Sequence, residues 1–330
     1  MTSGALANDT LTRRPRSCEP WFARAFGVEL ALDFDAPALR DGELEEVDDP
    51  TTLELVYAAG LDGLWRGAAT EPLGGMVDES GASVIDIRTT PEHGVLFAAK
   101  AHGRYLIGPD ARHVACAPPA VAEWYWQRML VGQVLPLVAA LRGLEVIHAS
   151  ALSFGDRAIA IAGAPGAGKS TLALELALRG HALLAEDVVA LRAEHGRVMA
   201  EPGVALVNLL PTAAARSVVE RAGLRVLGES HKIHVQLPRA ASALPLSALY
   251  LLDPVERGST NGRTVTSVPS PSPADFIGTS FVPYLTGSEY LQRHLAVAGA
   301  MADSMTVARV AVDPAVPPGA IADEIEAHAR

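Results

Sequence analysis

Short apolar runs alternate with polar breaks over the first third of the chain. Five such runs are separated by Gly, Pro and acidic residues: 28–34, 52–57, 83–87, 94–99 and 104–107. Runs of this length, bounded by turn-forming residues, are typical of β-strands. The pattern therefore predicts a small, strand-rich α+β N-terminal lobe over residues 21–117, with the segment CAPP at 116–119 as its end.

Longer patterns follow over residues 118–330. A helical pattern contains the apolar run 129–141, which is too short to cross a bilayer and predicts a buried helix kinked at Pro136. After His148 the order becomes strand, turn, strand, loop, helix, strand and hairpin. A loop is predicted at 253–275, with a hairpin turn at Asn261-Gly262. After it the pattern predicts a helix near 288–303, a strand at 306–312 and a last helix that begins at Pro317-Pro318.

Composition and charge narrow the class of protein. Hydrophobic residues make up 49% of the chain, which is enough for a sizeable core. The 38 acidic and 27 basic residues give a net charge of −11, which disfavours a nucleic-acid partner. The two cysteines form no disulfide framework, and residues 1–20 lack the apolar core of a secretion signal and predict a disordered tail. We expect a cytoplasmic protein that binds neither nucleic acid nor a membrane.

One segment carries a specific chemical signal, the sequence GAPGAGKST at residues 163–171. It matches the phosphate-binding loop pattern GxxxxGK[ST], and an apolar strand before it and a helix-forming segment after it supply the required context. In such a loop the backbone N–H groups and the helix N-terminus face the phosphates, the lysine reaches the β- and γ-phosphates, and the serine hydroxyl binds Mg²⁺. The expected nucleotide-binding residues are Gly163, Ala164, Pro165, Gly166, Ala167, Gly168, Lys169, Ser170 and Thr171. ATP or GTP with Mg²⁺ is the expected ligand.

His148 stands before the loop, at the start of a predicted hairpin. If the turn lies between Gly155 and Asp156, hairpin geometry places His148 opposite Gly163, at the mouth of the loop. A buried histidine bonded to a backbone carbonyl is the alternative. The register leaves both interpretations open.

Glu186 and Asp187 interrupt an otherwise apolar segment after the loop helix. Buried strands rarely contain charges without partners, and the phosphate loop, its metal ion and His148 would be suitable partners. Successive strand residues point to opposite faces, so a regular strand would bring only one carboxylate to the loop, and a bulge would be needed for both.

These residues together resemble the catalytic region of the HPr kinase/phosphorylase family. The shared features are His148, the loop GAPGAGKST, and RGHALLAEDVVAL with its paired acids. The resemblance implies an α/β fold of the phosphoenolpyruvate carboxykinase-like P-loop kinase type, with ATP and Mg²⁺ as cofactors. It implies that Asp187 is the catalytic base, that His148 interacts with the paired acids, and that Lys169 has the Walker lysine's role. Metal ligands implied in the same way are Ser170, Glu186, which replaces the family's first Asp, and Glu201.

Lys232 precedes a strand in which polar residues alternate with apolar ones, SHKIHVQLP. That pattern predicts a half-buried strand with a polar solvent face. Related kinase-like proteins often have a lysine before such a strand, so the resemblance also makes Lys232 a candidate contact for phosphate or acceptor.

The sequence lacks the long glycine-rich signature and the C-terminal arginine of authentic HPr enzymes. It is more similar to divergent HPr-kinase-like proteins of peptide natural-product (RiPP) biosynthesis, including lasso-peptide tailoring kinases. The implied activity is Mg²⁺-dependent transfer of the γ-phosphoryl group to a hydroxyl, most simply a serine of a precursor peptide or protein. The alternatives are a kinase of free serine or a sugar, and a regulatory protein that binds ATP without catalysis. Family members are often hexameric, which leaves a homo-oligomer open.

Overall fold

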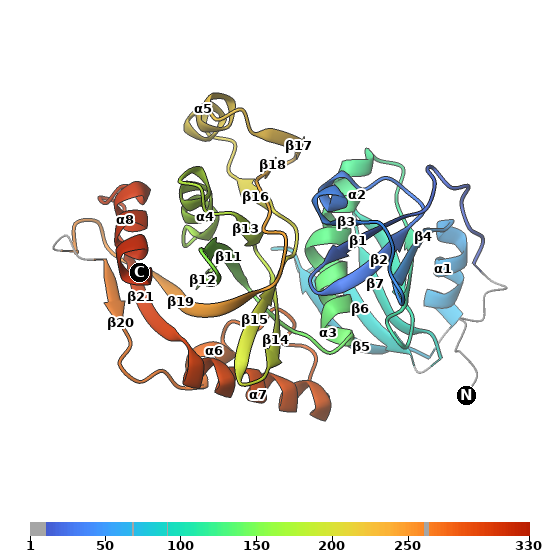
Figure 1. Ribbon diagram of the computed structural model, residues 1–330. Coiled ribbons are helices and arrows are strands. Elements are labelled where there is room, and N and C mark those ends of the chain that lie inside the picture. Colours follow the sequence, from blue (N-terminus) through green and yellow to red (C-terminus); the bar gives the residue numbers. More distant parts are fainter. Residues whose placement is uncertain (1–10, 68, 91, 261–263) are drawn as a thin grey trace. The chain divides into compact units, whose positions relative to one another are not determined.

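The computed structural model describes residues 11–67, 69–90, 92–260 and 264–330, and the chain forms two compact units, Met1–Arg142 and Gly143–Arg330 (Figure 1). Each unit combines sheets and helices, so the chain is a mixed α/β protein. The division falls at Arg142 rather than near residue 117, because the helical segment after 117 packs within the first unit. The ring of Trp126 lies 5.5 Å from that of Phe34, and Trp126 O accepts a hydrogen bond of 3.0 Å from the Tyr105 hydroxyl.

A nine-stranded sheet is the centre of the first unit, in the order β3-β1-β2-β4-β9-β8-β7-β6-β5. The five predicted strands are confirmed as β2, β4, β6, β7 and β8. The strands have the bounds β1 Trp21–Ala25, β2 Val28–Leu32, β3 Glu43–Leu44, β4 Thr51–Leu55, β5 Glu71–Val77, β6 Ser83–Thr90, β7 Gly94–Ala99, β8 Gly103–Ile107 and β9 His113–Ala117.

Helices complete the first unit. A 3₁₀ turn covers Pro37–Gly42, and α1 (Ala58–Gly67) buries Leu61 against Leu96 and Leu106 of the sheet. The predicted buried helix forms as α2 (Glu123–Met129) and α3 (Leu135–Leu141), joined by a π-helical turn over Leu130–Val134. The turn widens immediately before Pro136, which has no N–H group to continue the regular bonding.

Residues 11–20 belong to the first unit and are bound to its sheet, unlike the predicted disordered tail. Arg13 forms a backbone bridge with Val56, and its guanidinium pairs with the buried carboxylate of Glu54. A carboxylate in the core needs such a partner, which explains why this polar segment is held in place. Residues 1–10 lie outside the described residues.

The second unit contains a central sheet in the order β10-β14-β15-β19-β12-β11-β13, with β21 paired to β19 and β20 to β21. A three-stranded sheet, β16-β18-β17, stands beside it. The bounds are β10 Glu145–Ile147, β11 Ala149–Phe154, β12 Arg157–Gly163, β13 Leu183–Ala185, β14 Val189–Glu194, β15 Arg197–Glu201, β16 Leu206–Leu209, β17 Arg225–Glu229, β18 Ile233–Gln236, β19 Leu244–Pro254, β20 Val265–Ser267 and β21 Thr306–Val312.

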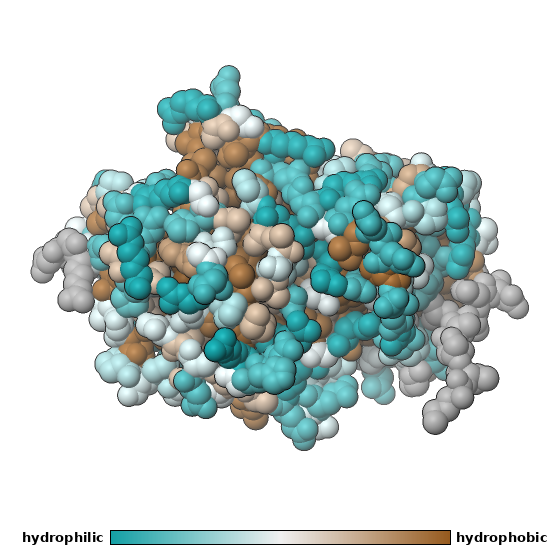
Figure 2. Space-filling view, viewed as in Figure 1, coloured by the Kyte–Doolittle hydropathy of each residue, from teal (hydrophilic) through white to brown (hydrophobic). Residues whose placement is uncertain are grey.

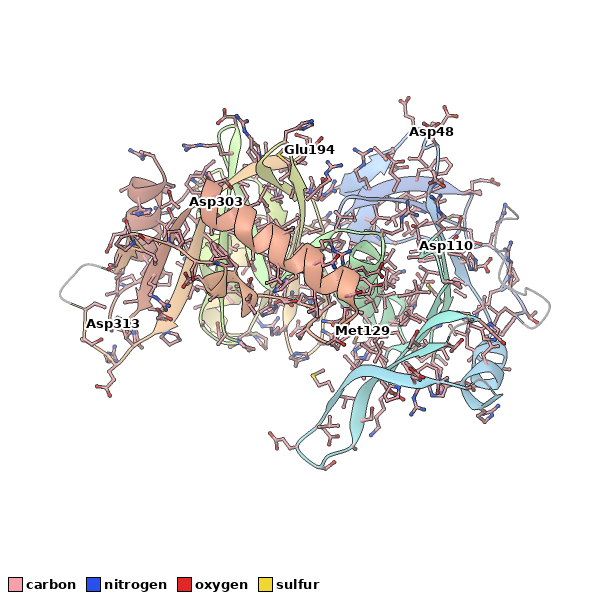
Figure 3. The ribbon with its side chains drawn as sticks, turned by 90° about the horizontal axis from the view of Figure 1, so that it is seen from below. Asp48, Asp110, Met129, Glu194, Asp303 and Asp313 are labelled. Carbon is pink, nitrogen blue, oxygen red and sulfur yellow. The ribbon has the colours of Figure 1, made fainter. Side chains whose placement is uncertain are left out.

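Helices cover both faces of the central sheet. In Figure 1, α4 (Lys169–Leu178) and α8 (Pro318–Ala329) lie on one face, and α6 (Ala274–Ile277) and α7 (Ser288–Ser304) on the other. Figure 3 shows α7 extended across its face. The alternation of β12 fits this arrangement, because Ile159 packs with the α4–α8 core and the neighbouring Ala160 with the α6–α7 core.

Several predicted segments of the second unit are confirmed. The strand at 306–312 is β21, and the two helices around it are α7 and α8. The predicted hairpin turn at Asn261-Gly262 lies outside the described residues. None of the described helices is both long and apolar enough to cross a membrane.

One surface of the second unit is apolar. Figure 2 shows hydrophobic surface near the top of the view, over the three-stranded sheet and α5 (Ala213–Arg221). Two exposed hydrophobic residues belong to this part of the chain: Leu210, between β16 and α5, is 64% exposed, and Val226, on β17, is 45% exposed.

Candidate active site

The segment with the phosphate-binding pattern lies between β12 and α4, and is called the phosphate loop here after that pattern. Gly168 has a φ of 105°, a left-handed conformation that suits glycine, and α4 begins at the next residue, Lys169. At the other end of the loop, a Cβ on Gly163 would lie only 2.9 Å from the Cβ of Leu252 on β19. Glycine is therefore required at both ends, for conformation at Gly168 and for close approach at Gly163.

Lys169 folds back over the loop. Its Nζ atom lies 2.8 Å from Gly163 O, 3.4 Å from Ala164 O and 3.0 Å from Nε2 of His148. These three acceptors use all three donors of the ammonium group. Burial lowers the pKa of Lys169, although the charges of Asp187 and Glu186 oppose that shift.

His148 lies at the mouth of the loop, as the predicted hairpin register requires. Strands β11 and β12 pair Ala149 with Ala162, so the preceding residue, His148, reaches the level of Gly163. Because an ammonium group can only donate, Nε2 of His148 accepts from Lys169, and the proton of the neutral ring is on Nδ1. Nδ1 faces Oδ1 of Asp187 at 3.6 Å. Burial lowers the pKa of His148, against the opposing charge of Asp187, which favours this neutral form.

The paired acids lie in a break between two strands instead of within one. Strand β13 ends at Ala185 and β14 begins at Val189, and Asp187 between them has a φ of 69°. A regular strand would separate the two carboxylates, and this left-handed residue removes that constraint. As a result, Asp187 faces His148 and Glu186 faces the start of α4.

Glu186 is held by two hydrogen bonds. Oε1 accepts from the Ser170 hydroxyl at 2.5 Å, and Oε2 accepts from Nδ2 of Asn208 at 2.8 Å. Burial, together with the nearby charge of Asp187, raises the pKa of Glu186 to about 8. A cation beside this carboxylate would favour its charged form.

Ser170 and Glu186 fit a magnesium ion held mainly by a nucleotide. Mg²⁺ usually keeps several waters and takes one or two protein oxygens in addition to phosphate oxygens. The serine hydroxyl and the carboxylate are adjacent oxygen ligands at a helix N-terminus, where phosphates bind. The described residues contain no cluster of three or more His, Cys, Asp or Glu side chains that would hold a metal ion without such help.

The third predicted metal ligand, Glu201, is engaged elsewhere. It lies at the end of β15, opposite Ala190, in the hairpin formed by β14 and β15. Its carboxylate accepts from Nη2 of Arg192 at 2.8 Å. The structure thus gives Glu201 an ion pair with Arg192, and its role as a metal ligand stays a prediction.

Lys232 lies close enough to act on the site electrostatically. Its charge adds to the lowering by burial of the pKa values of His148 and Lys169, and partly opposes the raised pKa of Glu186. The prediction that the polar residues of this strand face solvent is wrong for His234, which is fully buried.

Sequence reasoning missed three contributors. Asn208 on β16 and His234 on β18 are joined by a 2.6 Å hydrogen bond and extend the network from Glu186. Phe281 stacks near the ring of His148, at 6.3 Å between centroids and 16° between planes. The pairing of the Asn208 and His234 strands at matching positions could not be read from spacing alone, although a buried-looking Asn in the apolar run VALVNLL was a usable signal.

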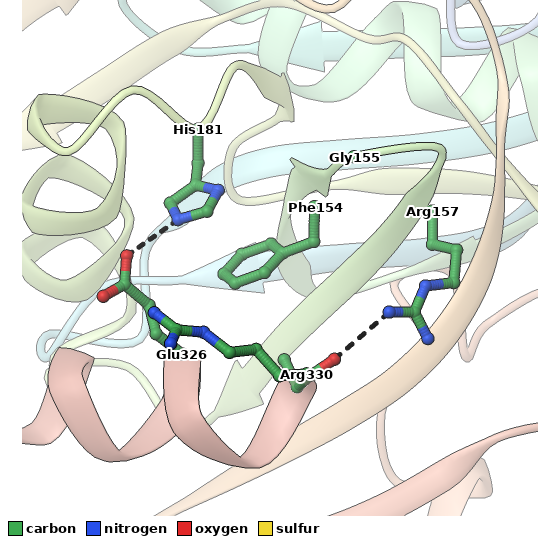
Figure 4. Close-up of a pocket in the computed structure, with 7 residues that line it drawn as sticks. Phe154, Gly155, Arg157, His181, Glu326 and Arg330 are labelled. Carbon is green, nitrogen blue, oxygen red and sulfur yellow. Dashed lines mark hydrogen bonds and ion pairs between the residues drawn. The ribbon is translucent and has the colours of Figure 1, made fainter.

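A separate cavity of about 220 Å³ opens at the other end of β11 (Figure 4). Phe154 and His181 stack there at 3.8 Å, and Nε2 of His181 lies 2.8 Å from the Glu326 carboxylate. None of the predicted site residues lines this cavity.

Comparisons with known proteins add little to this geometry. No family model matches the chain, and no curated protein matches it. Among solved structures, 56 chains match, including the HPr(Ser) kinase/phosphatase from Coxiella burnetii. That match has 15% sequence identity and a TM-score of 0.31, and covers 56% of this chain and 96% of the other. At this TM-score the similarity carries no argument about function, which depends on the site itself.

Proposed function

We propose that the protein is an ATP- and Mg²⁺-dependent kinase that phosphorylates a hydroxyl group, most simply a serine of a peptide or protein. The observation that supports this most is the contact chain from Lys169 through His148 to Asp187, beside the Ser170–Glu186 pair. A protein that only binds nucleotide needs no carboxylate and histidine at the mouth of its loop.

Bound ATP would supply a transferable γ-phosphoryl group, and bound Mg²⁺ would neutralise its charge. Asp187 would accept the proton of the acceptor hydroxyl. The hydroxyl oxygen would form the new bond to the γ-phosphorus as the bond from that phosphorus to ADP breaks. His148, with its Nδ1 proton toward Asp187, would orient that carboxylate. Lys169 would exchange its bonds to Gly163 and Ala164 for bonds to phosphoryl oxygens.

The decisive experiment incubates the purified protein with ATP and Mg²⁺ against serine-containing peptides, a phosphocarrier protein, free serine and sugars. Mass spectrometry is then used to find a gain of one phosphate. Phosphorylation of a peptide or protein, absent with Lys169→Ala, supports the proposal. Phosphorylation of free serine or a sugar alone would replace the acceptor. Slow ATP loss that no added alcohol accelerates would favour a regulatory nucleotide-binding protein.

A further inference from the structure

Three polar residues form a line that ends on Glu186; His234 is buried, and Asn208 and Ser230 are half-buried. Nδ2 of Asn208 donates to Glu186 Oε2 at 2.8 Å, Oδ1 of Asn208 lies 2.6 Å from Nδ1 of His234, and Nε2 of His234 lies 3.1 Å from the Ser230 hydroxyl. Asn208 and His234 are directly opposite each other in the paired strands β16 and β18. This line is called here the Ser230–His234–Asn208 relay.

The direction of each bond in the relay follows from its chemistry. In its charged form, which a bound cation would favour, the Glu186 carboxylate only accepts, so the amide of Asn208 turns its NH₂ group to Glu186 and its oxygen to His234. His234 must then carry a proton on Nδ1, which leaves Nε2 of the neutral ring to accept from Ser230. Each bond fixes the next, and together they leave Glu186 one orientation, with Oε1 toward Ser170.

The relay fixes the orientation of Glu186 at a buried position and also links Glu186 to the turn that contains Lys232. Glu186 and His234 are buried, where a loose carboxylate or imidazole would be costly. At its far end the relay reaches the turn that carries Lys232, where Ser230 N donates to Lys232 O at 2.9 Å. One hydrogen-bond line therefore connects the turn with the candidate substrate lysine to the serine at the start of the phosphate-loop helix.

We infer that Asn208 and His234 are positioning residues that hold Glu186 in the orientation needed to bind Mg²⁺ with the nucleotide. The inference rests on the proposed function, because it gives Glu186 a metal to bind. Partners that orient a metal ligand in this way typically change metal affinity by about 10- to 100-fold when they are removed. The residues act through Glu186 and need not touch the nucleotide.

The test measures metal affinity rather than turnover. The Kd of a non-hydrolysable ATP analogue is determined by calorimetry at increasing Mg²⁺ concentrations. The Mg²⁺ concentration that gives half of the maximal increase in nucleotide affinity is read from this series. The Kd is also determined in excess EDTA, where no Mg²⁺ is available. Asn208→Leu should raise that Mg²⁺ concentration by about 10- to 100-fold and leave the Kd in EDTA unchanged. His234→Leu should do the same from the far end of the relay. His234→Asn places an amide donor near the former Nδ1 position and should restore behaviour close to wild type.

Gln127→Met is the matched control. Gln127 is a buried amide, 3% exposed, whose Nε2 donates to Asp35 O at 2.7 Å, in the first unit. It should lower Tm without changing the Mg²⁺ dependence. If Asn208→Leu and His234→Leu also change only Tm, the relay is structural and the inference is wrong. If the affinity of the wild-type protein for the ATP analogue does not depend on Mg²⁺, the proposed function itself is wrong.

Discussion

Asp187 owes its place in the site to its backbone as much as to its charge. Its φ of 69° turns the chain between β13 and β14, and among non-glycine residues Asp and Asn adopt this conformation most readily. The carboxylate then faces His148, whose other nitrogen contacts Lys169. One residue thus provides both the break in the strand and the candidate base.

Asp187→Asn separates these two roles. Asn tolerates the same left-handed backbone, so the fold should be retained, while loss of the base should lower kcat by about 100-fold or more. Steady-state phosphorylation assays, with Tm and ATP-analogue affinity measured in parallel, check this expectation. Transfer at the wild-type rate would remove Asp187 as the base.

Several of these residues could be predicted from the sequence, for a physical reason. The loop glycines, Lys169 and Ser170 lie within one continuous segment, and the hairpin register locates His148 from a single short turn. Asn208 and His234 could not be found in the same way, because their contact depends on the pairing of β16 with β18 across a long connection. Lys232 was found only through resemblance.

The elements around the loop form a common edge. The parallel strands β12, β19 and β21 end near one another, with Gly163 paired to Leu252 and Pro254 paired to Val312. The side chain of Val312 lies beside Gly168, where an added Cβ would be 3.9 Å from its Cγ1 atom. The end of β21 therefore lies against the loop.

Asp313, the residue after β21, holds that end. Its carboxylate accepts from the backbone N–H groups of Gly258, Thr260 and Ala315 and from the Thr260 hydroxyl. These bonds lower the pKa of Asp313 below its ordinary value of 3.8. Because its charged form is favoured in the folded state, the carboxylate contributes stability above about pH 4, and the contribution is lost as the pH falls further.

Asp313→Asn should therefore lower Tm at neutral pH, since an amide replaces one acceptor oxygen with a donor. The difference in Tm from wild type should shrink as the pH falls below about 4. Thermal melts of both proteins over a pH series measure it. Arg309→Gln, which breaks an exposed ion pair with Asp253 near the same strand end, is the control and should change Tm little. A Tm difference for Asp313→Asn that does not vary with pH would contradict the assignment.

At the scale of the whole molecule, all candidate site residues belong to the unit Gly143–Arg330. That unit has its own sheet with cores on both faces. The first unit has its own nine-stranded sheet and includes α2 and α3, which lie after residue 117, where the sequence pattern predicted the end of the N-terminal lobe. We therefore expect the proposed nucleotide binding to be retained without the first unit.

Expression of residues 143–330 alone tests this separation. The fragment should unfold cooperatively and bind the ATP analogue with an affinity similar to that of the full chain, because every loop residue and both acids are present. Circular dichroism melts and calorimetry are the measurements. A folded fragment that binds nucleotide but no longer phosphorylates the acceptor would assign acceptor recognition to residues 1–142. A folded fragment without nucleotide affinity would show that the site needs the first unit.

The sequence pattern predicted the strands of the first unit better than the boundary between the two units. Runs bounded by turn residues located β2, β4, β6, β7 and β8 because local patterning determines strands. The unit boundary was misplaced because α2 and α3 look equally apolar whichever sheet they cover, and only tertiary contacts such as Trp126 with Phe34 decide it.

The left-handed turn at Asp187 also offers a practical tool. Because asparagine tolerates the left-handed backbone of this position, Asp187→Asn should still bind its acceptor while transferring phosphate about 100-fold or more slowly. Immobilised with an ATP analogue, that variant could select its own acceptor from a library of serine peptides. The left-handed backbone at position 187, which asparagine tolerates, would then allow the acceptor to be identified by affinity capture.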